Sequence, residues 1–246
     1  LDAVRSDSED EMTCTAQICE PPLQYHYLRR PDELSPATAT AVPRPRYLDA
    51  AGNPLPTSAE AARIAFTDYV IEIKPGIRYQ PHPAFAEQPA DISGFHPLAD
   101  FPNPATRDLV AADYVHALKR LAHPRLHSPI LGLMGEYIVG LNELAQKLQN
   151  SALAGRRQGA EEWLDLRQTD LEGVEVLHRY RYRIRIKGKY PQFLYWLSMP
   201  FFAPMPWEAE RFHSQPGMAE KNLTLDWYPI GTGPYMLTEN NPNARM

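Results

Sequence analysis

The residues that follow His178 alternate between basic and apolar side chains, and this pattern constrains the fold more than any other stretch of the chain. The odd-numbered positions are basic and the even-numbered positions are apolar: Arg179, Arg181, Arg183, Arg185, Lys187 and Lys189 against Tyr180, Tyr182, Ile184 and Ile186. Successive side chains of a β-strand point to opposite faces, so the pattern predicts one solvated cationic face and one face packed inward. The strand signal extends from residue 173 to residue 187.

A second local signal lies near the end of the sequence. Gly231, Thr232, Gly233 and Pro234 are followed by alternating apolar and polar residues. Glycine adopts backbone angles that other residues avoid, and proline fixes φ. The pattern predicts a tight connection that leads into a strand beginning near Tyr235.

Length and composition set broad limits. The chain has 246 residues, a net charge of −5 and 43% hydrophobic residues, which suits one large domain or two smaller ones. No apolar run reaches the roughly 18 residues of a membrane span. The 25 prolines amount to about twice the usual share and favour ordered loops over a helical bundle.

The sequence begins at Leu1 and ends at Met246, and we expect it to be a piece of a longer protein. A missing signal peptide therefore says nothing about compartment. Cys14 and Cys19 lie five residues apart, so on a helix they point in different directions, and we expect free, partly buried thiols.

Helices and loops alternate through the rest of the chain. Apolar residues at helical spacing predict helices over 110–121 and 136–150, with shorter ones at 193–197 and 207–213. Alternation over 69–73 predicts a half-buried strand. Residues 29–65 and 80–106 are proline-rich and predicted to be loops. The first includes a short extended piece, and the second is longer than loops usually run.

Three functional classes have little support in the residues. The basic alternation could hold phosphates, but the chain as a whole is acidic and no second basic element accompanies it. His123 and His127 have the spacing of helical metal ligands, but Pro124 lies between them. No nucleophile motif, P-loop or dinucleotide fingerprint is present, so neither an enzyme nor a cofactor is expected.

Several blocks resemble, in order, the peptide/nickel class of periplasmic solute-binding proteins, extracellular solute-binding family 5. The resemblance rests on the opening Leu1-Asp2, on the helix end at 18–23 (ICEPPL), and on the strand at 66–79 (FTDYVIEIKPGIRY). It continues through 111–120 (AADYVHALKR), 173–177 with 182–186, 190–194 with 199–206, and the block at 227–239. At Val110 the family's usual capping Thr is missing.

The resemblance implies an α/β fold of the periplasmic binding protein-like type II, with a mixed sheet and flanking helices. By this resemblance the chain is lobe one with its extra subdomain, and the second lobe is missing. Residues 1–20 and 172–246 would form a discontinuous core domain, and residues 21–171 an inserted subdomain.

The implied function is capture of a solute, an oligopeptide or dipeptide, for an importer of the ABC type. The chain would be periplasmic and monomeric, would hand its ligand to an ABC permease in the inner membrane, and would bind no nucleic acid. The alternative cargoes within the same fold are a nickel chelate, haem, an opine or a sugar.

The resemblance also suggests which residues of this lobe border the ligand cleft. The acidic stretch that includes Asp7 edges the cleft in the family, although a solvated loop or a helix N-terminus also explains its charges and is the simpler interpretation. Phe201 and Phe202 lie between prolines and could form a rigid apolar wall, or simply pack in the core. The expected ligand-binding residues are Ser6, Asp7, Ile130, Leu131, Phe201, Phe202 and Asn243.

Overall fold

A computed structural model describes residues 1–30, 33–89, 94–157 and 163–238. Its helices are α1 (Glu9–Ile18), α2 (Ala111–Arg120), α3 (Leu131–Tyr137), α4 (Leu141–Arg157), α5 (Phe193–Trp196) and α6 (Trp207–His213). Its strands are β1 (Leu23–Tyr25), β2 (Leu34–Pro36), β3 (Arg46–Leu48), β4 (Phe66–Glu72), β5 (Val174–His178) and β6 (Arg181–Lys187). Six 3₁₀ turns join them: η1 (Ala61–Arg63), η2 (Pro83–Phe85), η3 (Leu98–Asp100), η4 (Leu166–Gln168), η5 (Pro200–Phe202) and η6 (Ala219–Lys221).

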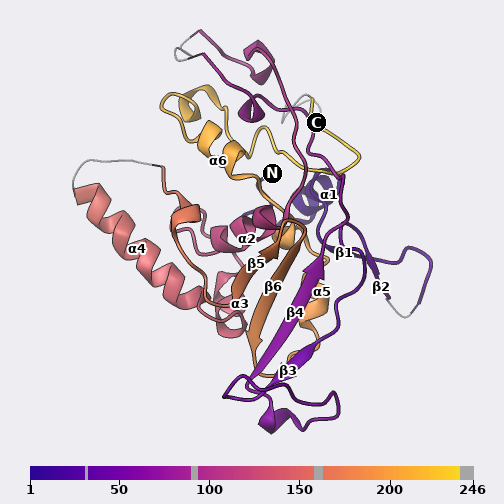
Figure 1. The fold of residues 1–246 in the computed structure, drawn as a ribbon. Helices are drawn as coiled ribbons and strands as arrows, with labels where there is room; N and C mark the ends of the chain where they lie inside the picture. Colours follow the sequence, from indigo (N-terminus) through magenta and orange to yellow (C-terminus); the bar gives the residue numbers. More distant parts are fainter. Residues whose placement is uncertain (31–32, 90–93, 158–162, 239–246) are drawn as a thin grey trace.

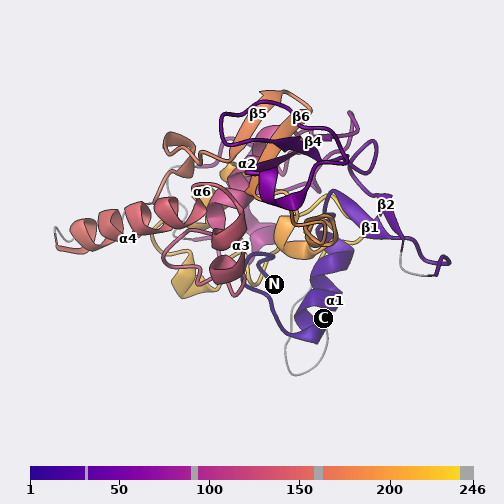
Figure 2. The same ribbon diagram turned by 90° about the horizontal axis from the view of Figure 1, so that it is seen from below.

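A four-stranded sheet in the order β3-β4-β6-β5 forms the centre, and each of its pairings is antiparallel. β1 and β2 form a separate hairpin to one side (Figure 1). Helices gather on one face of the sheet, and the last turns of α4 project from the body (Figures 1 and 2). The sheet pairs strands from within 21–171 with strands from 172–246, and the division into two units on those boundaries stays a prediction.

The alternation of residues 181–187 decides which face of β6 is buried. Tyr182, Ile184 and Ile186 are at most 1% exposed, as predicted. The register sets Tyr69 opposite Ile184 and Ile71 opposite Tyr182, so β4 and β6 present one continuous apolar face.

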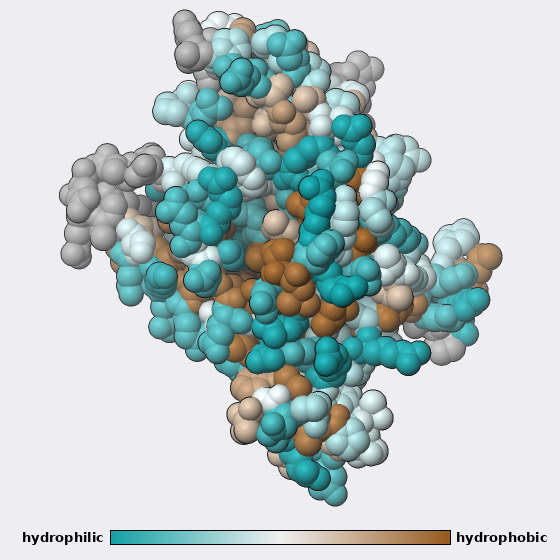
Figure 3. Space-filling model, in the orientation of Figure 1, coloured by the Kyte–Doolittle hydropathy of each residue, from teal (hydrophilic) through white to brown (hydrophobic). Residues whose placement is uncertain are grey.

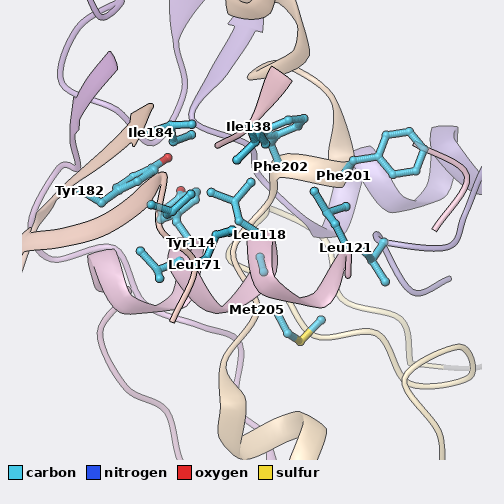
Figure 4. Packing of buried hydrophobic residues seen from close by; sticks show 14 of the residues in the cluster. Tyr114, Leu118, Leu121, Ile138, Leu171, Tyr182, Ile184, Phe201, Phe202 and Met205 are labelled. Carbon is cyan, nitrogen blue, oxygen red and sulfur yellow. The ribbon is translucent and has the colours of Figure 1, made fainter. Parts of the chain in front are cut away.

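Helix α2 and turn η5 cover this face. The Tyr114 ring of α2 stacks on Tyr182 with centroids 5.1 Å apart. Figure 4 shows Leu118 of α2 pointing into the same cluster and Phe202 beside Ile138. The core therefore lies between the sheet and the α2–η5 layer.

The cationic face of the sheet is matched by carboxylates. Its ion pairs join Arg181 to Glu72, Arg183 to Glu175 and Arg185 to Asp68, at 3.2, 2.9 and 2.7 Å. Hydrophilic side chains cover much of the molecular face shown in Figure 3. Because the basic row is compensated within its own sheet, it offers less to a nucleic-acid backbone than the sequence alone suggests.

Three predicted elements differ in the structure. The strand predicted over 173–187 is a hairpin of β5 and β6, because the chain reverses after His178 with a bulge near Val176. The helix predicted over 136–150 begins at Leu141, since Gly140 before it has a positive φ of 80°.

The strand predicted to begin near Tyr235 does not form within the described residues, which end at Thr238. The segment instead follows the C-terminal end of α1. Gly233 N–H donates to Ile18 O at 2.8 Å and Tyr235 N–H donates to Gln17 O at 3.3 Å. A helix end thus takes the hydrogen bonds that a neighbouring strand would otherwise take.

The two cysteines are free, as predicted, and burial raises the pKa of Cys19 to about 12. No helix in the described part of the chain is both long enough and apolar enough to cross a bilayer.

Candidate ligand-binding site

A buried arginine fixes the start of the chain, where two of the predicted site residues lie. Arg120 of α2 donates to both carboxylate oxygens of Asp2 at 2.9 and 2.5 Å. Its Nε donates to Glu210 of α6 at 3.0 Å, and the second oxygen of Glu210 lies 2.8 Å from His116 Nε2. All four side chains are buried, so this network ties the N-terminal segment to α2 and α6.

The network keeps its carboxylates ionised. Burial acts to raise the pKa of Glu210, but the Arg120 charge and the hydrogen bonds from His116 and Arg120 outweigh it and lower the pKa to about 2. Burial likewise opposes ionisation of Asp2, and Arg120 again prevails and lowers the pKa of Asp2. Charge-assisted hydrogen bonds of this kind are short and directional, so the segment has a defined position.

Asp7 sits between two fixed points of the backbone. Before it, Ser6 donates from its N–H and its hydroxyl to Asp2 O at 2.9 and 3.0 Å. After it, the Ser8 hydroxyl caps α1 by accepting from Glu11 N–H at 3.3 Å. Ser6 is buried with its hydroxyl engaged, whereas the Asp7 side chain is exposed.

Asp7 opens onto a shallow groove of about 490 Å³, which we call the α1 groove. The groove is lined by Asp7, Glu9, Met12, Thr13, Ala16 and Pro200. Its lining combines apolar atoms from α1 and η5 with the carboxylates of Asp7 and Glu9. An aliphatic chain that ends in a cation suits such a lining, since the chain can pack on the apolar atoms while its charge meets a carboxylate.

The structure brings only part of the predicted site together. Phe201 and Phe202 are 5% and 2% exposed. Both side chains therefore pack in the core, and neither forms an exposed apolar wall. The Phe202 ring packs edge-on against Phe193 with centroids 5.8 Å apart. Their neighbour Pro200 reaches the groove in their place.

The remaining predicted residues lie elsewhere. Ile130 is buried, and Leu131, which begins α3, is half-buried. Neither lines the α1 groove. Asn243 lies outside the described residues.

Four lining residues were not anticipated from the sequence: Met12, Thr13, Ala16 and Pro200. With Glu9, the three from α1 follow the spacing i, i+3, i+4, i+7, which places side chains on one helix face. The sequence contains this spacing, but α1 has few apolar residues, so the apolar periodicity that would indicate a helix face is weak.

A second depression, of about 680 Å³, contains none of the predicted residues. It lies between the β1–β2 hairpin and α5 and is lined by Arg30, Glu33, Leu34, Val42, Pro191, Gln192, Leu194 and Tyr195. As for metals, the described residues contain no group of three or more His, Cys, Asp or Glu side chains placed to hold an ion.

Comparison with known proteins points to one family. A family model described as bacterial extracellular solute-binding proteins, family 5 Middle, matches residues 106–246. A search of curated protein sequences found no match.

Solved structures of similar fold include two that were determined with a bound peptide. Burkholderia pseudomallei OppA is 15% identical, with a TM-score of 0.59 over 98% of this chain and 34% of its own. Listeria monocytogenes OppA bound to peptide is 13% identical, with a TM-score of 0.57 over 97% of this chain and 33% of its own. Helicobacter pylori DppA in complex with a peptide is 16% identical, with a TM-score of 0.56 over 98% and 34%. The chain therefore spans about a third of the length of these proteins.

Proposed function

The chain belongs to family 5 of the bacterial extracellular solute-binding proteins, and from this premise we propose that it binds an oligopeptide or dipeptide in the periplasm for import by an ABC permease. The match over residues 106–246 is the observation that carries the proposal, and the peptide-bound structures of similar fold support the choice of cargo. The family and these neighbours are binding proteins, and we propose no enzymatic activity.

The mechanism we propose is closure of two lobes around the solute. The chain has the fold of one lobe of a type II periplasmic binding protein and covers about a third of the solved relatives. A ligand that contacts both lobes stabilises the closed state, because it binds that state better than the open one. The protein would act as a monomer and present the closed form to the permease.

The first-lobe contribution is assigned to the α1 groove and its surroundings. Asp7 is the exposed predicted residue with a fixed backbone, so it is the one we expect to touch the solute. Phe201 and Phe202 would support Pro200 from below. Ser6 would position Asp7, and Ile130, Leu131 and Asn243 stay predicted border residues without a contact assigned here.

Identification of the natural ligand tests the proposed function. The intact protein, purified without denaturation, is expected to release a peptide mass in native mass spectrometry. Isothermal titration with that peptide should then give a measurable affinity. Release of a nickel chelate, haem, an opine or a sugar instead would keep the fold assignment and refute the peptide cargo.

Replacement of Asp7 by Asn is expected to weaken binding of a lysine-containing peptide by about three- to tenfold, because an exposed charge pair contributes about 1 kcal/mol. Calorimetry on the intact protein provides the measurement. Asp10→Asn is the matched control, since Asp10 lies in the first turn of α1 but does not line the groove. Equal affinities for wild type and Asp7→Asn would remove Asp7 from the site.

A further inference from the structure

Two buried histidines join a proline-rich arm of the chain to α6. The arm consists of residues 79–86 and 101–107, whose backbones pair through His82 N–H to Ala105 O at 2.8 Å and Tyr79 N–H to Arg107 O at 3.1 Å. Its turn η2 packs on α6. There His82 and His213 are 1% and 8% exposed, with ring centroids 5.2 Å apart.

The hydrogen bonds of the two rings fix complementary tautomers. His82 Nδ1 accepts from Ala84 N–H at 3.0 Å, so the proton of the neutral ring is on Nε2. His213 Nδ1 lies 2.9 Å from Leu223 O and must donate, so its lone pair is on Nε2. Both Nε2 atoms are buried, and neither has a hydrogen-bond partner within the described residues.

Neither ring can bind a second proton in the closed state without losing a hydrogen bond or burying an unpaired N–H group. On His82 the proton would go to Nδ1, where it would face the Ala84 N–H and remove that hydrogen bond. On His213 it would go to Nε2, which is buried without an acceptor. The rings that surround the pair are aromatic, with Phe212 centroids 5.3 Å from His82 and 5.0 Å from His213, and Phe85 6.4 Å from His82.

Few charges act on the pair. Burial, and then repulsion from His213, lower the pKa of His82 to about 3. Burial lowers the pKa of His213 to about 4, although the Leu223 carbonyl and the Asp2 carboxylate oppose the shift. Asp2 is itself held by Arg120, so it offers His213 little compensation.

We propose that this histidine pair makes the attachment of the arm to α6 acid-sensitive, closed while both rings are neutral and released when they are protonated. Each ring binds a proton more weakly in the closed state than in the open one. The stabilisation is therefore complete above the ordinary histidine pKa near 6.5 and is lost as the pH falls below it. Between about pH 7 and about pH 5 the opening equilibrium should rise about 25-fold for each ring and several hundredfold for both.

Release of the arm would also break its hydrogen bonds to the segment that carries Gly231 and Gly233. Gln80 N–H donates to Gly231 O at 3.0 Å, and Gln80 Nε2 donates to Pro229 O at 2.9 Å.

Amide hydrogen exchange on the intact protein tests the proposal, with rates at about pH 7 and about pH 5 corrected for their intrinsic pH dependence. We expect opening at the Ala84 and Ala105 amides to rise several hundredfold in wild type and about 25-fold in His82→Asn. Asn is chosen because its side-chain oxygen can still accept from Ala84 N–H. The double variant His82→Asn/His213→Asn should show no acid effect.

His96→Gln is the matched control, because His96 is an exposed histidine close to the arm, and this variant should keep the full wild-type response. An unchanged acid effect in the double variant would overturn the proposal. So would an equal acid effect at the Ile184 amide in β6, since that would be global unfolding. Nitrogen NMR showing His82 protonated on Nδ1 at neutral pH would contradict the assigned tautomers.

Discussion

Replacing Arg120 with Ala is expected to lower the free energy of unfolding by about 3–5 kcal/mol at neutral pH, the usual cost of removing one partner from a buried ion pair. The substitution leaves Asp2 and Glu210 buried without their cation. Denaturant unfolding followed by circular dichroism at constant salt gives the measurement.

An exposed ion pair provides the control. Arg29 lies 2.7 Å from Glu33, and both side chains are more than half exposed. We expect Arg29→Ala to change stability by less than about 1 kcal/mol. A similar small loss in Arg120→Ala would show that the buried network contributes little.

The pH dependence of the Arg120 variant has a defined sign. Because the folded-state pKa of Glu210 is lowered to about 2, its contribution to stability is complete above its ordinary pKa and is lost as the pH falls toward 2. Arg120→Ala lacks that contribution, so the difference in free energy of unfolding between wild type and variant should become smaller below about pH 4.

Gly231→Ala is expected to lower stability by about 2–4 kcal/mol, since overpacking against rigid neighbours is costly. A Cβ at this position would lie 1.9 Å from Ile18 O and 2.6 Å from Ile18 C. Both are backbone atoms at the end of α1, which cannot move aside as a side chain could. Thermal and denaturant unfolding both report the loss.

Gly132→Ala is the matched control, because a Cβ there would meet nothing within 4 Å. In helix α3 the exchange should be neutral or stabilise by up to about 1 kcal/mol. If Gly231→Ala were as stable as the wild type, the backbone of Gly231 would lie farther from the end of α1 than the structure shows.

The faces of the sheet could be read from the sequence, because side-chain alternation follows from strand geometry alone. The sequence does not predict which carboxylates neutralise the arginines, since Asp68 and Glu72 lie more than a hundred residues from β6 along the chain. For the same reason the partner of the Gly231–Tyr235 segment was missed. The glycines indicate that another backbone comes close, but the neighbouring residues do not indicate that this backbone is α1.

The ligand-binding role of the predicted site residues stays a prediction. The acidic stretch led to Asp7, which lines the α1 groove. The prolines around Phe201 and Phe202 indicate rigidity but not exposure, and packing against Phe193 decided their place. Family resemblance transfers the position of a loop more reliably than the direction of each side chain.

The arginine network also sets an order of events in synthesis. Asp2 and Glu210 lie 118 and 90 residues from Arg120 along the chain, so both contacts are long-range. Contacts of large sequence separation form late, after the entropy of loop closure has been overcome. The segment that carries Asp7 is translated before α2 and α6, yet it acquires its final position only after α6 has emerged from the ribosome.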